Sequence, residues 1–208
     1  MSTTSTQPTN VSGVNAPSRP LDDQEKAIAR HLVRDPRATD KSISDATGVP
    51  LRTVGRKRQK LEQEGLLRYW ASVDLGEGGT GQYNASHLYI IKFALGVTYE
   101  NLREKIRGER QIPELTDMIA ESHIAEIDGK LSLLFVIEGT SDRDIVRSVH
   151  ERLIPSLMKN HGAHSIQEIT TLRLLSPVRV LRNYLPLINM AGSTMRRDWP
   201  EDAIYVGK

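Results

Sequence analysis

The residues of this sequence best suited to chemistry lie between positions 52 and 60, where nine residues hold five basic side chains and no acidic one. Arg52, Arg56 and Lys60 recur every four residues, a spacing that places them along one face of a helix. An arginine can donate two hydrogen bonds to a guanine edge, and a lysine neutralises a phosphate. Because the whole chain has a formal net charge of only +2, this local excess predicts a defined surface for a polyanion.

The segment that must position these side chains is residues 21–75, for which the sequence predicts three helices followed by a strand. The third helix, residues 51–64, carries the basic side chains and has Val54 and Leu61 on its inner side at helical spacing. The residues expected to cap or break the helices are Asp22, Asp35-Pro36, Thr39 or Asp40, Gly48 and Gly65.

Two short helices, a glycine turn and a basic third helix form a winged helix-turn-helix when a strand-like wing follows, and this motif presents one helix to the major groove of double-stranded DNA. The wing is residues 66–75 (LLRYWASVDL), in which we expect Tyr69 and Trp70 to be core residues. The alternative for the basic stretch is a solvated helix face without a partner. We expect DNA contacts from Lys41, Ser42, Arg52, Thr53, Arg56, Lys57, Lys60 and Arg68.

A glycine-rich linker, residues 76–82, separates this domain from a second one, residues 83–176. The second domain alternates strand, helix, strand, strand, helix and strand, which is the ferredoxin-like βαββαβ sandwich. Asp128-Gly129 between two strand-like segments predicts a tight hairpin. Two helices would cover one face of the sheet, so we expect the other, partly apolar face to pair with a second copy of the chain. The predicted fold class is therefore α+β.

The two ends of the chain lack the patterns of these domains. Residues 1–20 contain three prolines and no hydrophobic period, which predicts a disordered tail. Residues 177–208 form a C-terminal arm, in which 178–190 is predicted as a short helix or an extended segment and 195–208 as disordered. No apolar run approaches the ~18 residues that span a bilayer, so we expect no membrane contact and a cytoplasmic location. The absence of cysteine excludes disulfides and thiolate metal sites.

The DNA-binding segment resembles the corresponding half of the Lrp/AsnC (feast/famine) transcriptional regulators. The shared marks are Leu21-Asp22, Asp35-Pro36-Arg37, Gly48-Val49, Thr53-Val54 and Leu61-Glu62 before Gly65. The second domain has the element order of the family's ligand-sensing domain, so the resemblance covers about residues 21–176. It implies a nucleoid-associated homodimer, often assembled further into tetramers or octamers, which regulates transcription and binds an amino acid or another small metabolite.

The hairpin after Asp128 departs from the family pattern where the resemblance implies an effector site. The family has a glycine followed, two residues on, by an aromatic residue, then Asp and often a second aromatic residue. This chain has Leu131 and Leu133 at the aromatic positions and Ser132 at the Asp position. An effector is therefore absent or is not a free amino acid, and the candidate effector contacts are Gly129, Leu131 and Ser132.

A second departure is Arg58, which stands where the family has an apolar residue on the inner side of the third helix. A long arginine stem can cover apolar surface while its charged head reaches water. We therefore expect this position to be compatible with the predicted fold.

Two other functions remain compatible with this sequence. Sirohaem decarboxylases of haem biosynthesis resemble the same family and would need His and Arg near a tetrapyrrole, for which His87 and His123 are candidates. An architectural DNA-compacting protein would use the same basic side chains, because phosphate binding and base recognition need the same residue types. His161 and His164 have no further ligand at metal-binding spacing, and no hydrolase or metalloprotease motif is present. The sequence therefore predicts no metal, no cofactor and no enzymatic activity.

Overall fold

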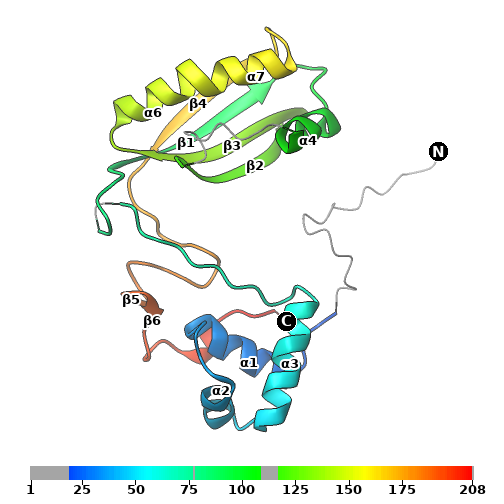
Figure 1. The fold of residues 1–208 in the computed structure, drawn as a ribbon, viewed down its shortest axis with the longest axis vertical. Coiled ribbons are helices and arrows are strands. Elements are labelled where there is room, and N and C mark those ends of the chain that lie inside the picture. The colour runs from blue at the N-terminus through cyan, green and yellow to red at the C-terminus, as the bar shows by residue number, and fades with distance from the viewer. Residues whose placement is uncertain (1–18, 77, 109–116, 208) are drawn as a thin grey trace, which may run out of the picture. The chain divides into compact units, whose positions relative to one another are not determined.

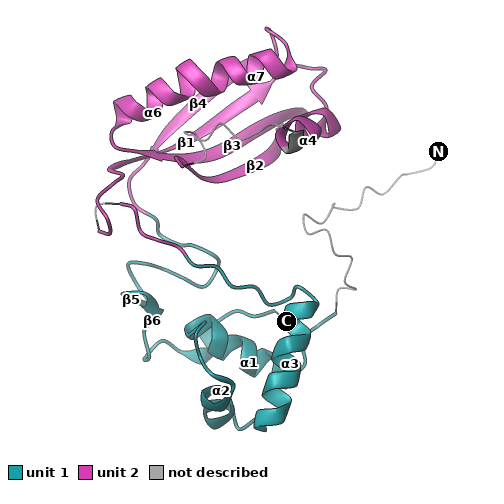
Figure 2. Cartoon of the chain, viewed as in Figure 1, with its two compact units in different colours: residues 1–71, 177–208 teal, residues 72–176 magenta. Residues whose placement is uncertain are grey.

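The computed structural model describes residues 19–76, 78–108 and 117–207. Two compact units divide the chain: residues up to 71 together with 177–208, and residues 72–176 (Figures 1 and 2). The predicted 1–20 tail lies outside the described residues except for its last two. One of these, Arg19, forms ion pairs with Glu25 at 2.7 Å and with Glu64 at 2.6 Å. Arg19 therefore links the first helix of this unit to the residue that ends the third helix.

The first unit is built on three short helices, as the sequence predicts: α1 (Asp23–Arg34), α2 (Asp40–Thr47) and α3 (Leu51–Gln63). Asp22 accepts a hydrogen bond from the backbone N–H of Glu25, whose carboxylate accepts one from the backbone of Asp22, so α1 begins with a capping box. A cluster of buried side chains holds the three helices together: Ile28, Leu32, Ala38, Ile43, Val49 and Val54.

The turn between α2 and α3 and the end of α3 also match the sequence. Thr39, one of the two expected caps, accepts the hydrogen bond at the start of α2. Gly48 and Gly65 follow α2 and α3 with φ of 70° and 66°, in the left-handed region where a side chain would be strained. The helix-turn-helix is therefore fixed by local signals that lie within a few residues of each helix end.

Residues 66–75, predicted as the strand of a wing, form no strand: residues 66–67 form a bend and 68–75 have no regular secondary structure. A strand needs a neighbour to complete its hydrogen-bond ladder, and the described residues supply none for this segment. The chain instead turns back at 76–81, and the N–H of Tyr83 donates to the carbonyl of Leu75 at 2.8 Å before the first strand of the second unit begins. The prediction that Tyr69 and Trp70 are core residues is also wrong, because 41% and 70% of their surfaces are exposed.

The second unit confirms the predicted βαββαβ order. Its elements are β1 (Ala85–Phe93), α4 (Tyr99–Gly108), β2 (Ile119–Ile127), β3 (Lys130–Gly139), α6 (Asp142–Ser148), η1 (Val149–Leu153), α7 (Ile154–His161) and β4 (Ile166–Leu174). The strands are antiparallel in the order β2-β3-β1-β4, as in a ferredoxin-like sandwich. Asp128 and Gly129 have φ of 51° and 74°, as a type I′ hairpin turn requires. Residues 109–116 lie outside the described residues, and they include Leu115, the first residue of the second predicted strand (115–127).

The core of the second unit lies between the sheet and its helices (Figure 1). Tyr89 on β1 and Phe135 on β3 stack at 5.3 Å between ring centres, and Leu102 of α4 and Ile145 of α6 join the same cluster. α6, η1 and α7 follow one another directly, and the π-helical turn η1 comes just before Pro155, whose ring cannot fit a regular α-helical turn. Among the described residues, no helix combines the length and the apolar run needed to cross a bilayer.

The face of the sheet turned away from the helices carries a strip of apolar side chains. Leu88 pairs across strands with Val136, and Ile90 pairs with Leu134; all four are half-buried. Leu172 on β4 extends the strip beside Leu88 and is 45% exposed. This face is therefore partly apolar, as the alternation of the strands predicts.

The C-terminal arm folds onto the first unit and does not form the helix that the sequence allowed. Its elements are a β-bridge between Val180 and Tyr184, a hairpin of β5 (Met190–Ala191) and β6 (Thr194–Met195), and the short 3-10 turn η2 (Glu201–Ala203). The prediction of disorder for 195–208 is wrong for its described part, since Met195 and Ile204 are buried. These two side chains supply the apolar burial that a disordered tail would lack.

Candidate nucleic-acid interface

α3 presents the predicted basic face to solvent. Three exposed side chains four residues apart form this face, and we call them the α3 stripe: Arg52, Arg56 and Lys60. In the described part of the chain the two arginines form no ion pair, and the lysine has a long contact of 3.8 Å with Glu64. Val54 and Leu61, on the inner side of α3, are completely buried. Their burial fixes the rotation of the helix, so the stripe must point outward.

The other side chains expected to contact DNA lie in the same unit. Lys41 and Ser42 are exposed in the first turn of α2, and Thr53 is half-buried beside the stripe. Arg68 is exposed just after α3, and its Nε donates a hydrogen bond to the carbonyl of Gly65 at 3.1 Å. Lys41 and Ser42 are thus accessible, whereas part of the Arg68 guanidinium already has a local partner.

Lys57, also expected to contact DNA, is a buried structural residue with 9% of its surface exposed. Its ammonium group forms an ion pair with Asp22, the residue that caps α1. The hydrogen bond from Lys57 holds the pKa of the Asp22 carboxyl below its ordinary value of 3.8. The sequence contains the signal for this burial, because Lys57 lies three residues after Val54 and four before Leu61, in the inward-facing helical period.

Arg58 is half-buried and links α3 to α2 through polar contacts. Its Nη1 donates to the carbonyl of Ala38 at 3.0 Å and to the carboxylate of Asp40 at 3.1 Å. Its Nε lies 3.2 Å from a Glu62 carboxylate oxygen and 3.1 Å from the Tyr69 hydroxyl. The sequence suggested that the stem of Arg58 covers apolar surface. In the structure its guanidinium is instead stabilised at this inner position by hydrogen bonds to polar groups on two sides.

Arg56 and Lys57 are adjacent in sequence but occupy different environments, which allows a direct test of the interface. We expect Arg56→Met to weaken DNA binding about fivefold at physiological salt and to reduce the log–log salt slope by about 0.9, because one phosphate contact is lost. Lys57→Met should leave both quantities unchanged, since its ammonium group faces Asp22. Fluorescence anisotropy of a labelled duplex at several salt concentrations measures both; a larger effect from Lys57 would contradict the assignment.

The ion pair between Lys57 and Asp22 predicts a pH dependence of the first unit's stability. Because the folded-state pKa of Asp22 is lowered, the pair stabilises the fold above pH 3.8 and the contribution is lost as pH falls through the lowered pKa. Asp22→Asn keeps a good helix cap but removes the charge, so it should cost about 1 kcal/mol or less at pH 7, the value for half-exposed pairs. Urea unfolding followed by tryptophan fluorescence should show this difference at pH 7 and a smaller one near pH 3. A difference that does not depend on pH would contradict the electrostatic origin.

The hairpin residues considered for an effector do not converge on one surface. Gly129 lies in the turn, and Leu131 packs against the core between the sheet and its helices. Ser132 pairs with Lys92 and Ala125 on the neighbouring strands, so alternation places it on the other face of the sheet. Its hydroxyl is completely buried and has no hydrogen-bond partner among the described residues.

The two histidines considered for an enzyme are also separated. His87 is buried on the helix side of β1, with Nε2 at 2.8 Å from an Asp142 carboxylate oxygen. His123 is exposed on β2 and lies 2.7 Å from Glu121. Cross-strand pairing with Leu134 places His123 on the opposite face of the sheet from His87. In the described residues, no group of three or more His, Asp or Glu side chains could hold a metal ion.

Comparison with known proteins gives a family match for the first part of the chain. Residues 21–68 match a family described as winged helix-turn-helix DNA-binding. A search of curated proteins gave no match. The matched family segment contains α1, α2 and the whole α3 stripe.

Several solved structures share the fold at low sequence identity. A transcriptional regulator of Neisseria meningitidis, in complex with L-methionine, has a TM-score of 0.58 and 15% identity over 77% of this chain and 94% of its own. AsnC of E. coli has a TM-score of 0.56 and 17% identity over 78% and 97%. An AsnC family regulator of Agrobacterium tumefaciens has a TM-score of 0.57 and 14% identity over 82% and 100%. Residues 21–68 are therefore a winged helix-turn-helix DNA-binding domain, and the larger part of the chain has the fold of the Lrp/AsnC transcriptional regulators.

Proposed function

We propose that this protein is a sequence-specific transcriptional regulator of the Lrp/AsnC type, which works through DNA binding and not through catalysis. The observation that carries the proposal is the α3 stripe, an exposed basic helix face inside a winged helix-turn-helix domain. Arginines on such a helix can recognise guanine in the major groove, while lysines and the start of α2 bind phosphate. Its place of action is the DNA of the nucleoid, in the cytoplasm.

The proposed working form is a homodimer, with further assembly into tetramers or octamers as a second step. A two-fold dimer would present two copies of α3 to successive major grooves of a roughly palindromic site. The apolar strip on the open face of the sheet supports this proposal, because Leu88, Ile90, Leu134 and Val136 would be covered by the same strip of a second copy.

A charge placed in the apolar strip should separate the dimer. We expect Leu88→Glu to shift the protein from dimer to monomer at micromolar concentration, because an unpaired carboxylate would be buried in the interface. Light scattering after size exclusion measures the mass. Leu175→Glu is the matched control, since Leu175 lies just beyond β4 and is 88% exposed. If Leu88→Glu remains a dimer, the interface lies elsewhere.

A small metabolite is the proposed modulator of this regulator. One structure with the same fold contains L-methionine, which supports a small-molecule effector here. The Ser132 hydroxyl is buried and has no hydrogen-bond partner in the part of the chain that the structure describes, so it is the polar group of the hairpin best able to receive such a ligand. A ligand that binds two assembly states unequally would shift the population between them and so change DNA occupancy.

Binding of the full-length protein to sheared genomic DNA, followed by sequencing, tests the proposed function. A regulator should enrich discrete sites with two half-sites about 10.5 base pairs apart or a multiple of this spacing. Uniform coverage would instead support the architectural alternative, in which phosphate contacts dominate. Failure to retain any DNA at low salt would overturn both functions.

A further inference from the structure

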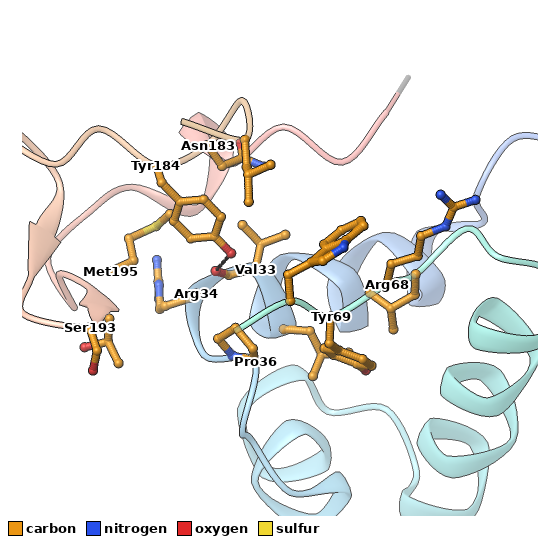
Figure 3. Close-up of a pocket in the computed structure, with 14 residues that line it drawn as sticks. Val33, Arg34, Pro36, Arg68, Tyr69, Asn183, Tyr184, Ser193 and Met195 are labelled. Carbon is orange, nitrogen blue, oxygen red and sulfur yellow. Dashed lines mark hydrogen bonds between the residues drawn. The ribbon is translucent and has the colours of Figure 1, made fainter. Parts of the chain in front are cut away.

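The first unit contains a cavity of about 300 Å³ that no residue of the α3 stripe lines. Three segments of this unit line it, the end of α1, residues 67–70 after α3, and the C-terminal arm (Figure 3). Figure 3 shows the hydroxyl of Tyr184 in the arm pointing to Val33 of the helical domain, with Met195 beside Tyr184. The arm therefore completes a site on the DNA-binding domain.

The wall formed by the arm is held in place by specific hydrogen bonds. The Tyr184 hydroxyl donates to the carbonyl of Val33 at 2.9 Å, and Nη2 of Arg34 donates to the carbonyl of Trp199 at 2.6 Å. Asn189 is completely buried; its side chain accepts a hydrogen bond from the backbone of Leu185 at 2.8 Å and donates one to the backbone of Asn183. These bonds make the wall a folded element, as a preformed ligand site requires.

The charged residues that line the cavity are all basic. Arg34 and Arg68 line it from opposite sides, and none of the described residues that line it carries a carboxylate. Nε of Arg34 is buried and has no hydrogen-bond partner in the described structure. A buried donor left without a partner is costly, and in a native protein it commonly marks a site that a ligand or water completes. Nη1 of Arg34 lies 3.4 Å from a Glu201 carboxylate oxygen and Nη2 binds the carbonyl of Trp199, so Nε is the donor left for a negatively charged group.

The rest of the lining is mostly apolar. Leu32, Pro36, Leu67 and Met195 surround the space, and Trp70 adds an aromatic side chain that is 70% exposed. A volume of about 300 Å³ is at the lower end of small-molecule sites. These properties fit a small acid with an apolar body.

We propose that this cavity binds a small organic monocarboxylic acid with an aromatic or branched aliphatic body, with its carboxylate on Arg34 and its body between residues 67–70 and the arm. The site differs from the hairpin of residues 129–132, because all of its lining residues belong to the first unit. The end of α1 and the segment that follows α3 form part of its walls. Binding of the acid therefore acts on the helices of the DNA-binding domain and changes the affinity of the protein for DNA. This second consequence rests on the proposed function, whereas ligand binding itself does not.

Titration of the full-length protein with phenylacetate and with 4-methylpentanoate, in the absence of DNA, tests the binding. Either acid should quench the fluorescence of Trp70 and raise the Tm of the first unit, and phenylacetamide should do neither because it lacks the charge. Trp199→Phe removes the other tryptophan, so the signal comes from the cavity. If neither acid binds at millimolar concentration, the proposal is overturned.

Three variants locate the site. Arg34→Gln removes the charge and should weaken phenylacetate binding at least about tenfold, through the loss of one charged hydrogen bond. Thr194→Trp leaves Arg34 in place but fills the space from the arm, and it should weaken binding to a similar extent by steric exclusion. Arg37→Gln is the matched control, because Arg37 is exposed and does not line the cavity. Unchanged affinity in both cavity variants would overturn the site.

A separate measurement tests the link to DNA. Phenylacetate at saturation should change the Kd for duplex DNA by about five- to a hundredfold, the usual range of allosteric coupling, and Arg34→Gln should abolish the change. Binding of the acid by a protein that fails to bind DNA would overturn the proposed function but not the cavity site. DNA binding without any binding of the acid would overturn the site alone.

Discussion

Replacing Arg52, Arg56 and Lys60 together with alanine is expected to weaken DNA binding about a hundredfold at physiological salt. Each phosphate contact contributes about 0.9 to the log–log salt slope, so three lost contacts should reduce the slope by roughly two to three units. The fold should be preserved, because all three side chains are exposed and surface substitutions usually change stability by about 0.5 kcal/mol or less. Anisotropy titrations between ~50 and ~200 mM salt measure affinity and slope together.

A triple alanine variant of the second unit separates the effect of the surface from the effect of net charge. Lys105, Arg143 and Lys159 are exposed on α4, α6 and α7, and their removal lowers the charge of the chain by the same amount. We expect this control to keep the salt slope of the unmodified protein. If both variants lose affinity equally, the general charge of the chain dominates, and α3 is not the DNA contact surface.

The second large effect is expected from Phe135→Ala in the centre of the sheet. Phe135 is 2% exposed, and its ring stacks on Tyr89 with an angle of 5° between the planes. Truncation of such a side chain costs about 3–5 kcal/mol, through lost transfer energy and the cavity left behind. Because domains of this size are stable by only about 5–15 kcal/mol, the second unit should unfold at much lower urea, and the proposed dimer should weaken with it.

The positions of the tryptophans make this prediction specific to one unit. Trp70 and Trp199 both belong to the first unit, so tryptophan fluorescence follows that unit, while circular dichroism follows both. Phe135→Ala should lower the urea midpoint seen by circular dichroism and leave the fluorescence midpoint in place. Phe135→Leu is the matched control and should cost about 1 kcal/mol, as volume-conserving apolar exchanges do. An unchanged dichroism transition would contradict the packing around Phe135.

Much of the architecture could be predicted because its signals are local. Asp22 and Thr39 cap helices through bonds to residues three positions away, and Gly48 and Gly65 end helices by their own backbone freedom. The hairpin turn at Asp128-Gly129 is likewise set by two residues. The order of the strands followed because short antiparallel and split βαβ connections allow few topologies.

The predictions that failed concern side chains whose partners are distant in sequence. Lys57 pairs with Asp22, which lies 35 positions away. The positive charge of Lys57 alone therefore could not show that it differs from the exposed basic residues of the α3 stripe. Residues 66–75 have the composition of a strand, but a strand exists only when a neighbour completes its ladder. Trp70 was expected to be buried for its size, yet nothing in the described first unit covers it.

The sequence by itself determined the helix-turn-helix, the ferredoxin-like order and the outward direction of Arg52, Arg56 and Lys60, since helical spacing and capping act over about four residues. Only the tertiary structure decided which partners Lys57 and Arg58 bind and that the C-terminal arm returns to the first helix. Arg34 meets the carbonyl of Trp199 across 165 positions of sequence. No local pattern records such a contact, because its free energy depends on which surfaces the complete fold brings together.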